Sequence, residues 1–285
     1  MRKTSHHSRV PRYLINFLLI AFSLHTVAGV MAGEKDSVDL TDVWVNTADS
    51  LLIEATVAFK KAKGVDERSR ALAGAVLALA RPPISESDWD EIEPVLAKLA
   101  EGDDAIAARA LYLQARMYQV HLSIPDYGKA EELFREVARR WPASHWAQLG
   151  FTKLGLVKLF ALPEPTDAGG RLQEVVALLG DIQEPTLRRD LQLQIGWAGM
   201  FYERPLDEVL PHLIAADAVP GMMGITPEDL KIQIGELSFR AGHLEQAKRY
   251  FEEFLAVYPS NTRKFNVQQQ LLKVLAALGE AEAVP

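Results

Sequence analysis

The residues ITPEDLKIQIGELSFRAGHLEQAKRYFEEFLAVYP, from Ile225 to Pro259, decide the fold, because they contain two amphipathic helical patterns joined by a tight turn. The first pattern begins at Thr226-Pro227, where a threonine oxygen can accept a free amide and a proline stands where no donor is missed. Apolar residues then recur at the spacing of one helix face: Leu230, Ile234, Leu237 and Ala241. We therefore expect a first helix with one buried face.

A second helix follows at once, because Gly242 permits the left-handed turn that ends the first. Its apolar face has the same spacing, and a proline stops it: Ala247, Phe251, Phe254, Tyr258 and Pro259. Gly235, in the first helix, lets the second helix approach closely. The stretch is thus predicted to be a helix–turn–helix pair.

The pattern of the second helix occurs twice in the chain. The same order of small, aromatic and proline positions stands 117 residues earlier (247 − 130): Ala130, Phe134, Val137, Trp141 and Pro142. This spacing fits about three repeats of roughly 39 residues, against ~34 in tetratricopeptide repeats. On these residues the chain resembles tetratricopeptide-repeat proteins, in particular those of the bacterial periplasm and envelope. The resemblance implies an all-α fold, a right-handed superhelical solenoid of antiparallel helix pairs.

The period divides the rest of the chain into further helix pairs, within a solenoid over residues 47–279. The predicted repeats are 66–101, 103–142, 144–181, 184–217 and 226–259, with a capping helix at 262–278 and a flexible tail at 280–285. Polar residues mark the helix starts: Asn46 or Asp49, Asp66, Ser85 or Ser87, Asp103 or Asp104, Asp126, Ser144, and Asn261 or Thr262. One helix is expected to run to about Leu122, and Pro211 should bend or shorten another.

Residues 1–32 have the three parts of a secretory signal. Four cations without an acid come first, an apolar run from Leu14 to Leu24 follows, and small residues end the segment. Cleavage after Ala28 or Ala32 fits the small-residue rule. An uncleaved membrane anchor, barely long enough to span a bilayer, is the alternative, and a buried core helix is a third. We expect export, with a linker at residues 33–46.

Composition and charge restrict the partners. With 48% hydrophobic and 24% charged residues, the 285-residue chain can bury a continuous core. It has no cysteine, so neither disulfides nor a lipid-modified cysteine can hold it. Removing the four cations of residues 1–32 takes the net charge from −7 to −11 (−7 − 4). This charge disfavours nucleic acid and anionic membrane surfaces, and it favours partners with basic patches. Membrane contact is expected only through an uncleaved N-terminal segment.

No catalytic, cofactor-binding or metal-binding pattern is found in the sequence. The histidines beyond the N-terminal segment, His121, His145, His212 and His243, have no ligand neighbour at helical spacing, and phosphate loops and nucleophile elbows are absent. The acidic cluster Asp88, Asp90, Glu91 and Glu93 is explained by a solvated first turn of a helix. Met222 and Met223 form either an adaptable contact or a loop on the core.

One predicted surface stripe is the candidate binding site. Its residues lie on the helix face opposite the apolar one: Arg109, Tyr112, Arg116 and Gln119. The family resemblance implies that first helices line a concave wall where peptides lie, so the next repeat would add Trp146, Leu149 and Lys153. Such a cationic and aromatic patch can clamp an acidic peptide or a C-terminal carboxylate. The alternative is a solvated helix face with extended arginines.

These observations predict a non-enzymatic protein-interaction scaffold that is exported to the cell envelope, needs no cofactor and binds a protein or peptide in its concave groove. A membrane-anchored assembly factor for an envelope complex is the first alternative. A helical-repeat hydrolase is the second, and it would need a catalytic acid walled by apolar neighbours, which the sequence does not indicate.

Overall fold

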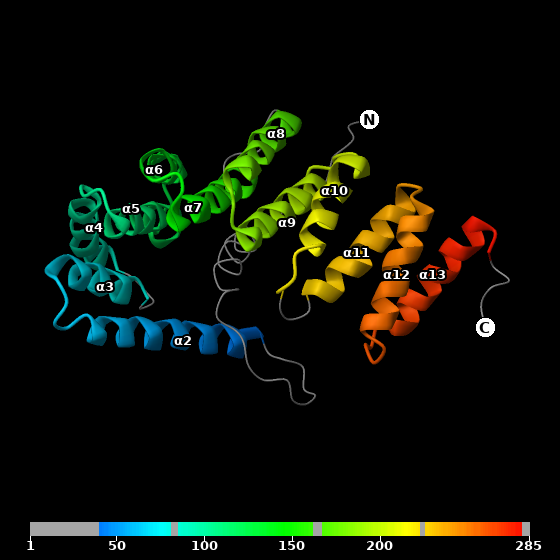
Figure 1. Ribbon diagram of the computed structural model, residues 1–285, viewed down its shortest axis with the longest axis horizontal. Coiled ribbons are helices and arrows are strands. Elements are labelled where there is room, and N and C mark those ends of the chain that lie inside the picture. Colours follow the sequence, from blue (N-terminus) through cyan, green and yellow to red (C-terminus); the bar gives the residue numbers. More distant parts are fainter. Residues whose placement is uncertain (1–39, 81–84, 162–166, 223–225, 281–285) are drawn as a thin grey trace, which may run out of the picture. The chain divides into compact units, whose positions relative to one another are not determined.

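The computed structural model describes residues 40–80, 85–161, 167–222 and 226–280. These residues form helices and connecting turns, and no β-strand occurs among them (Figure 1). The chain divides into two compact units, residues 1–161 and 162–285. The all-helical prediction is therefore confirmed, whereas the division into two units was not predicted from the sequence.

The first unit contains helices that pack mainly on their neighbours in the chain. They are α2 (Leu40–Lys61), α3 (Glu67–Leu79), α4 (Glu86–Ala100), α5 (Ala105–Arg116), the π-helix η1 (Met117–His121), α6 (Tyr127–Arg140), α7 (His145–Leu156) and the π-helix η2 (Val157–Ala161). In addition, α5 contacts both α3 and α7. Alternate helices thus lie side by side, as they do when antiparallel pairs stack.

The second unit repeats this arrangement. It contains α8 (Ala168–Leu178), the 3₁₀ turn η3 (Leu179–Asp181), α9 (Pro185–Phe201), α10 (Leu206–Asp217), α11 (Thr226–Arg240), α12 (Leu244–Val257) and α13 (Lys264–Leu278). Each helix packs on the next, and α11 also contacts α13.

Side-chain caps begin the helices α3 to α7. In each case a side-chain oxygen accepts from the backbone amide three residues later, which satisfies an otherwise free donor: Asp66 from Ser69, Ser85 from Asp88, Asp104 from Ala107, Asp126 from Lys129, and Ser144 from Ala147. Asp88 also accepts from the Ser85 amide, completing a capping box. The structure therefore identifies Ser85, and not Ser87, as the cap of α4, and Asp104, and not Asp103, as the cap of α5.

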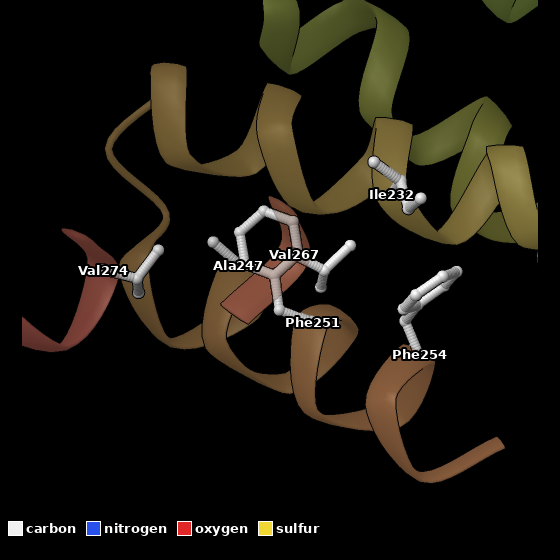
Figure 2. Packing of buried hydrophobic residues seen from close by; sticks show 6 residues of the cluster. All are labelled: Ile232, Ala247, Phe251, Phe254, Val267 and Val274. Atoms are coloured by element: carbon white, nitrogen blue, oxygen red, sulfur yellow. The ribbon is translucent and has the colours of Figure 1, made fainter. Parts of the chain in front are cut away.

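The decisive stretch forms α11 and α12 as predicted. A methyl group on Gly235 would lie 2.5 Å from the Phe251 ring, so only glycine permits this approach of the two helices. Phe251 and Phe254 are fully buried in a cluster that includes Ile232 and Val267. Figure 2 shows these side chains converging between α11, α12 and α13. The earlier copy of the pattern is buried as well: Ala130, Phe134 and Val137.

Two first helices in the second unit end in the same way. After α11, the Gly242 amide donates to Phe239 and the His243 amide to Ser238, with Gly242 at φ 81°. After α9, the amides of Glu203 and Arg204 donate in the same pattern, 39 residues earlier (242 − 203), with Glu203 at φ 53°. Both are Schellman turns, which need one left-handed residue.

Several predicted boundaries are wrong. Helix α2 begins at Leu40, inside the expected linker 33–46, so neither Asn46 nor Asp49 starts it. Helix α13 begins at Lys264, so the residue at its N-cap position is Arg263 and not Asn261 or Thr262.

The helix that was expected to run to Leu122 changes to a π-helix after Arg116. A π-turn accommodates an additional residue in a helix. Helix α10 continues through Pro211 to Asp217, so the proline does not end it.

The predicted signal, residues 1–32, lies outside the described residues, as does most of the predicted tail 280–285. Among the residues that the structure describes, no helix is both long enough and apolar enough to span a membrane.

Candidate functional site

The predicted site residues all belong to the first unit. Arg109, Tyr112 and Arg116 lie on α5, Gln119 lies in η1, and Trp146 and Lys153 lie on α7. Their helices are positioned by the Asp104 and Ser144 caps and by the packing of α5 on α7. The structure therefore brings together two helices that the repeat register had placed next to each other.

An arginine and two aromatic rings form the centre of the cluster. The Arg109 guanidinium carbon lies 5.1 Å from the centroid of the Trp146 ring, within the range of a cation–π interaction. The Tyr112 ring lies 5.4 Å from Trp146 and 5.9 Å from Phe134, measured between centroids. Tyr112 thus connects the candidate site to the buried pattern residue Phe134.

The second arginine, Arg116, lies seven residues (116 − 109), about two turns, further along α5. The Arg116 guanidinium donates to the side-chain oxygen of Gln119, which lies in the π-helix. Burial lowers the pKa of Arg116 and that of Arg109, and it raises the pKa of Tyr112. Arginine nevertheless stays charged near neutral pH, so the cluster carries two positive charges in a partly desolvated setting.

The expectation of a surface stripe is wrong for three of the six residues. Tyr112, Gln119 and Lys153 expose only 6%, 1% and 3% of their surface, whereas Arg109, Arg116 and Trp146 remain partly exposed. The sequence pattern treats α5 as one helix against one core, but α7 covers part of the opposite face as well. The three partly exposed side chains therefore form the accessible part of the cluster, with Tyr112 against Trp146 and Gln119 bonded to Arg116.

Two buried donors in this cluster have no hydrogen-bond partner among the described residues. They are Nε of Arg109 and Nε2 of Gln119. A buried donor without an acceptor costs free energy, so such groups are rare unless a ligand or water supplies the acceptor. What the cluster lacks is an oxygen acceptor, such as a carboxylate or a carbonyl.

Sequence reasoning missed His121, which lies at the end of η1. Its pKa is lowered to about 4, first by burial and then by the positive charge of Arg116. It also missed two buried polar residues of α7, Gln148 and Thr152. The signal that was available is the spread of apolar residues over more than one face of α7, which predicts a helix buried on more than one side.

The acidic cluster on α4 is accounted for in part by local structure. Asp88 belongs to the capping box, and Glu93 accepts a hydrogen bond of 2.6 Å from the Gln114 amide. No group of three potential metal ligands occurs among the described residues. Met222 is half-buried beside Gly221, and Met223 lies outside the described residues.

The cluster of Arg109, Tyr112, Arg116, Gln119 and Trp146 is thus a cationic, aromatic and donor-rich site on two adjacent helices. The chain matches no protein-family model and no curated protein. The assignment of this site therefore rests on its geometry.

Proposed function

We propose that the chain is a non-enzymatic protein-interaction scaffold of the cell envelope, and that the α5–α7 face binds an acidic peptide segment or a C-terminal carboxylate. The observation that carries the proposal is the Arg109–Trp146–Tyr112 group with its two unpartnered buried donors. The chain as a whole is negatively charged, with a formal net charge of −7. A local concentration of positive charge in such a chain indicates a binding site for an anionic group.

The chemistry of the three partly exposed residues, Arg109, Arg116 and Trp146, favours a carboxylate. Guanidinium groups present planar pairs of donors that match carboxylate oxygens, and partial desolvation strengthens such bonds. The Trp146 ring holds Arg109 in place from one side. A ligand would first contact Arg109, Arg116 and Trp146, because the remaining predicted site residues, Tyr112, Gln119 and Lys153, are buried.

We also propose that the helix pairs are tetratricopeptide-like repeats arranged as a right-handed superhelical solenoid. The close contact of Gly235 with Phe251 has a counterpart 39 residues earlier (235 − 196), where a methyl group on Gly196 would lie 2.4 Å from Leu213. The two Schellman turns have the same spacing. These repeated contacts support a common unit, and in such a unit the first helices α5 and α7 face the ligand.

Export to the periplasm or cell envelope is part of the proposal and rests on the signal pattern of residues 1–32. A disulfide-free, helix-packed domain is compatible with that location, because its stability needs no oxidation step.

Binding of displayed peptides tests the function. A peptide library with free C-terminal carboxylates is selected on the purified protein, and the selected peptides are resynthesised with C-terminal amides or with Glu and Asp replaced by Gln and Asn. Removing the carboxylates should weaken binding about tenfold or more, as loss of a charge-assisted hydrogen bond does. Selected peptides whose binding does not depend on a carboxylate would contradict the proposal.

The variant Arg109→Gln with Arg116→Gln should bind the selected peptides more weakly by the same factor as removal of their carboxylates does. The matched control is Arg135→Gln with Arg139→Gln on α6, where the two side chains are 54% and 71% exposed and pair with Glu131 and Glu136. The control should bind within about twofold of the original chain, since exposed pairs contribute little. Equal losses in both variants would show that general charge, rather than the α5–α7 face, attracts the peptide.

A further inference from the structure

The second unit contains a pocket of ≈ 280 Å³ that the sequence did not indicate. Three consecutive helices line it. The lining residues are Gly169, Leu172, Gln173 and Val176 from α8, Ile195 and Gly199 from α9, and Arg204, Glu208, Val209 and His212 from the start of α10 and the turn before it. This site shares no residue with the α5–α7 cluster.

The inner part of the pocket is apolar and closely packed. Leu172, Ile195 and Val209 expose 8%, 2% and 1% of their surface. A methyl group on Gly199 would lie 2.8 Å from Val209, so the absence of a side chain there shapes the wall. An apolar cavity of about 150 Å³ holds a benzene ring. A pocket of ≈ 280 Å³ therefore has room for one substituted ring, but it is below the usual size for a drug-sized ligand.

One wall is an ion pair held by an unusual backbone turn. Arg204 donates through Nε and Nη2 to the two oxygens of Glu208, each at 3.0 Å. Arg204 directly follows Glu203, the one non-glycine residue with positive φ in the described chain. Since the two charges satisfy each other, this wall is not a free anion site.

The remaining polar lining residues are Gln173, which is exposed, and His212, which is half-buried. Nδ1 of His212 lies 2.6 Å from Oε1 of Gln192, and an amide oxygen can only accept, so Nδ1 carries the hydrogen. Burial lowers the pKa of His212. The neutral ring therefore has a lone pair on Nε2, and no hydrogen bond to Nε2 occurs within the described part of the chain.

We propose that this pocket binds a phenol group, with the ring against Leu172, Ile195 and Val209 and the hydroxyl donating to Nε2 of His212. An apolar body with a single donor matches buried apolar residues that lie beside one half-buried acceptor, Nε2 of His212. The same phenol chemistry is supplied by a tyrosine side chain of a protein or by a free small phenol.

Binding of small probes to the full chain tests the assignment. Titrations with p-cresol, toluene and p-toluate are followed by two-dimensional NMR at the amides of Gly169 and Gly199. We expect p-cresol to shift both amides and to bind about fivefold to tenfold more tightly than toluene, which lacks the donor. Tighter binding of toluene or p-toluate, or shifts that miss both glycines, would overturn the proposal.

Two histidine variants test whether Nε2 of His212 is the acceptor of the phenol hydroxyl. In His212→Phe the advantage of p-cresol over toluene should disappear, whereas in the control His145→Phe, at an exposed histidine of the other unit, it should remain. Loss of the advantage in both variants, or in neither, would also overturn the proposal. The probe series on the unmodified chain decides the matter if His212→Phe fails to fold.

N-acetyl-tyrosinamide distinguishes the two sources. Binding at the same glycines supports a tyrosine of a protein partner, and binding of p-cresol without binding of the blocked tyrosine supports a free phenol.

Discussion

Individual residues in this chain follow local rules well where the rule involves only neighbouring backbone. The caps Asp66, Asp126 and Ser144 were predicted because each needs only a side-chain oxygen three residues before a free amide. The burial of Tyr112 and Gln119 could not be predicted in this way. It depends on other helices, because α7 packs on α5 and α6 packs on η1, and neither contact is encoded in the spacing of α5 itself.

Phe251→Ala should lower the free energy of unfolding by roughly 3–5 kcal/mol, the usual range for emptying a buried aromatic site. The ring is 1% exposed and packs on Gly235 and on the cluster with Val267. Urea denaturation of the variant measures the loss. Phe265→Ala is the matched control, since Phe265 is 76% exposed and its removal should change little. Similar stabilities of Phe251→Ala and the original chain would disprove the register of α12.

Acidification should destabilise the protein through His121. Its pKa is about 4 in the folded chain and 6.5 in the reference state, so the unfolded chain takes up the proton first. Stability is therefore complete above about pH 6.5 and is lost as the pH falls toward 4, by up to about 3 kcal/mol.

Urea denaturation at pH 7 and pH 4.5 measures this effect. His121→Gln, which cannot titrate, should lose less stability between these two pH values than the original chain, and His145→Gln, at an exposed position, should lose as much as the original chain. An unchanged pH dependence in His121→Gln would mean that His121 titrates normally in the fold.

At the scale of helices, the sequence predicted where helices begin better than how they end. The starts of α3 to α7 are encoded by caps, but the ends of α5 and α7 are π-helices, which have no comparable residue signature. The end of α9 was obscured for another reason. Its left-handed position is occupied by Glu203, where the equivalent turn after α11 has the expected Gly242.

Exchange of these two turn residues should have opposite effects. Glu203→Gly should raise the free energy of unfolding by about 0.5–1 kcal/mol, because relief of left-handed strain exceeds the greater freedom of glycine in the unfolded chain. Gly242→Glu should lower it by about 1 kcal/mol or more, although the space around Gly242 is open. Thermal melts of both variants check the pair, and changes of equal sign would show that the two turns differ in conformation.

At the scale of the whole molecule, the all-helical fold was predictable because the apolar spacing of α11 and α12 recurs in α6 and in the other helices. The division near residue 161 was not, since the proline- and glycine-rich residues 162–170 also fit an ordinary loop between two helices of one repeat. The lack of hydrogen-bond acceptors at the candidate site could be predicted only in part. The residue types were visible in the sequence, whereas the unpartnered donors of Arg109 and Gln119 emerge from packing.

The signal pattern of residues 1–32 predicts the location of the whole molecule. We expect residues 1–28 or 1–32 to be removed on export, because a short apolar run followed by small residues suits a signal peptidase better than a membrane span. Intact-mass measurement of the protein expressed in a bacterial host should give a chain that begins at Gly29 or Gly33. Ala28→Leu with Ala32→Leu should block cleavage, because a signal peptidase requires small residues at its site. A full-length chain that stays with membranes after carbonate washing would instead identify residues 14–33 as an anchor, and the interaction face would then act at the membrane surface.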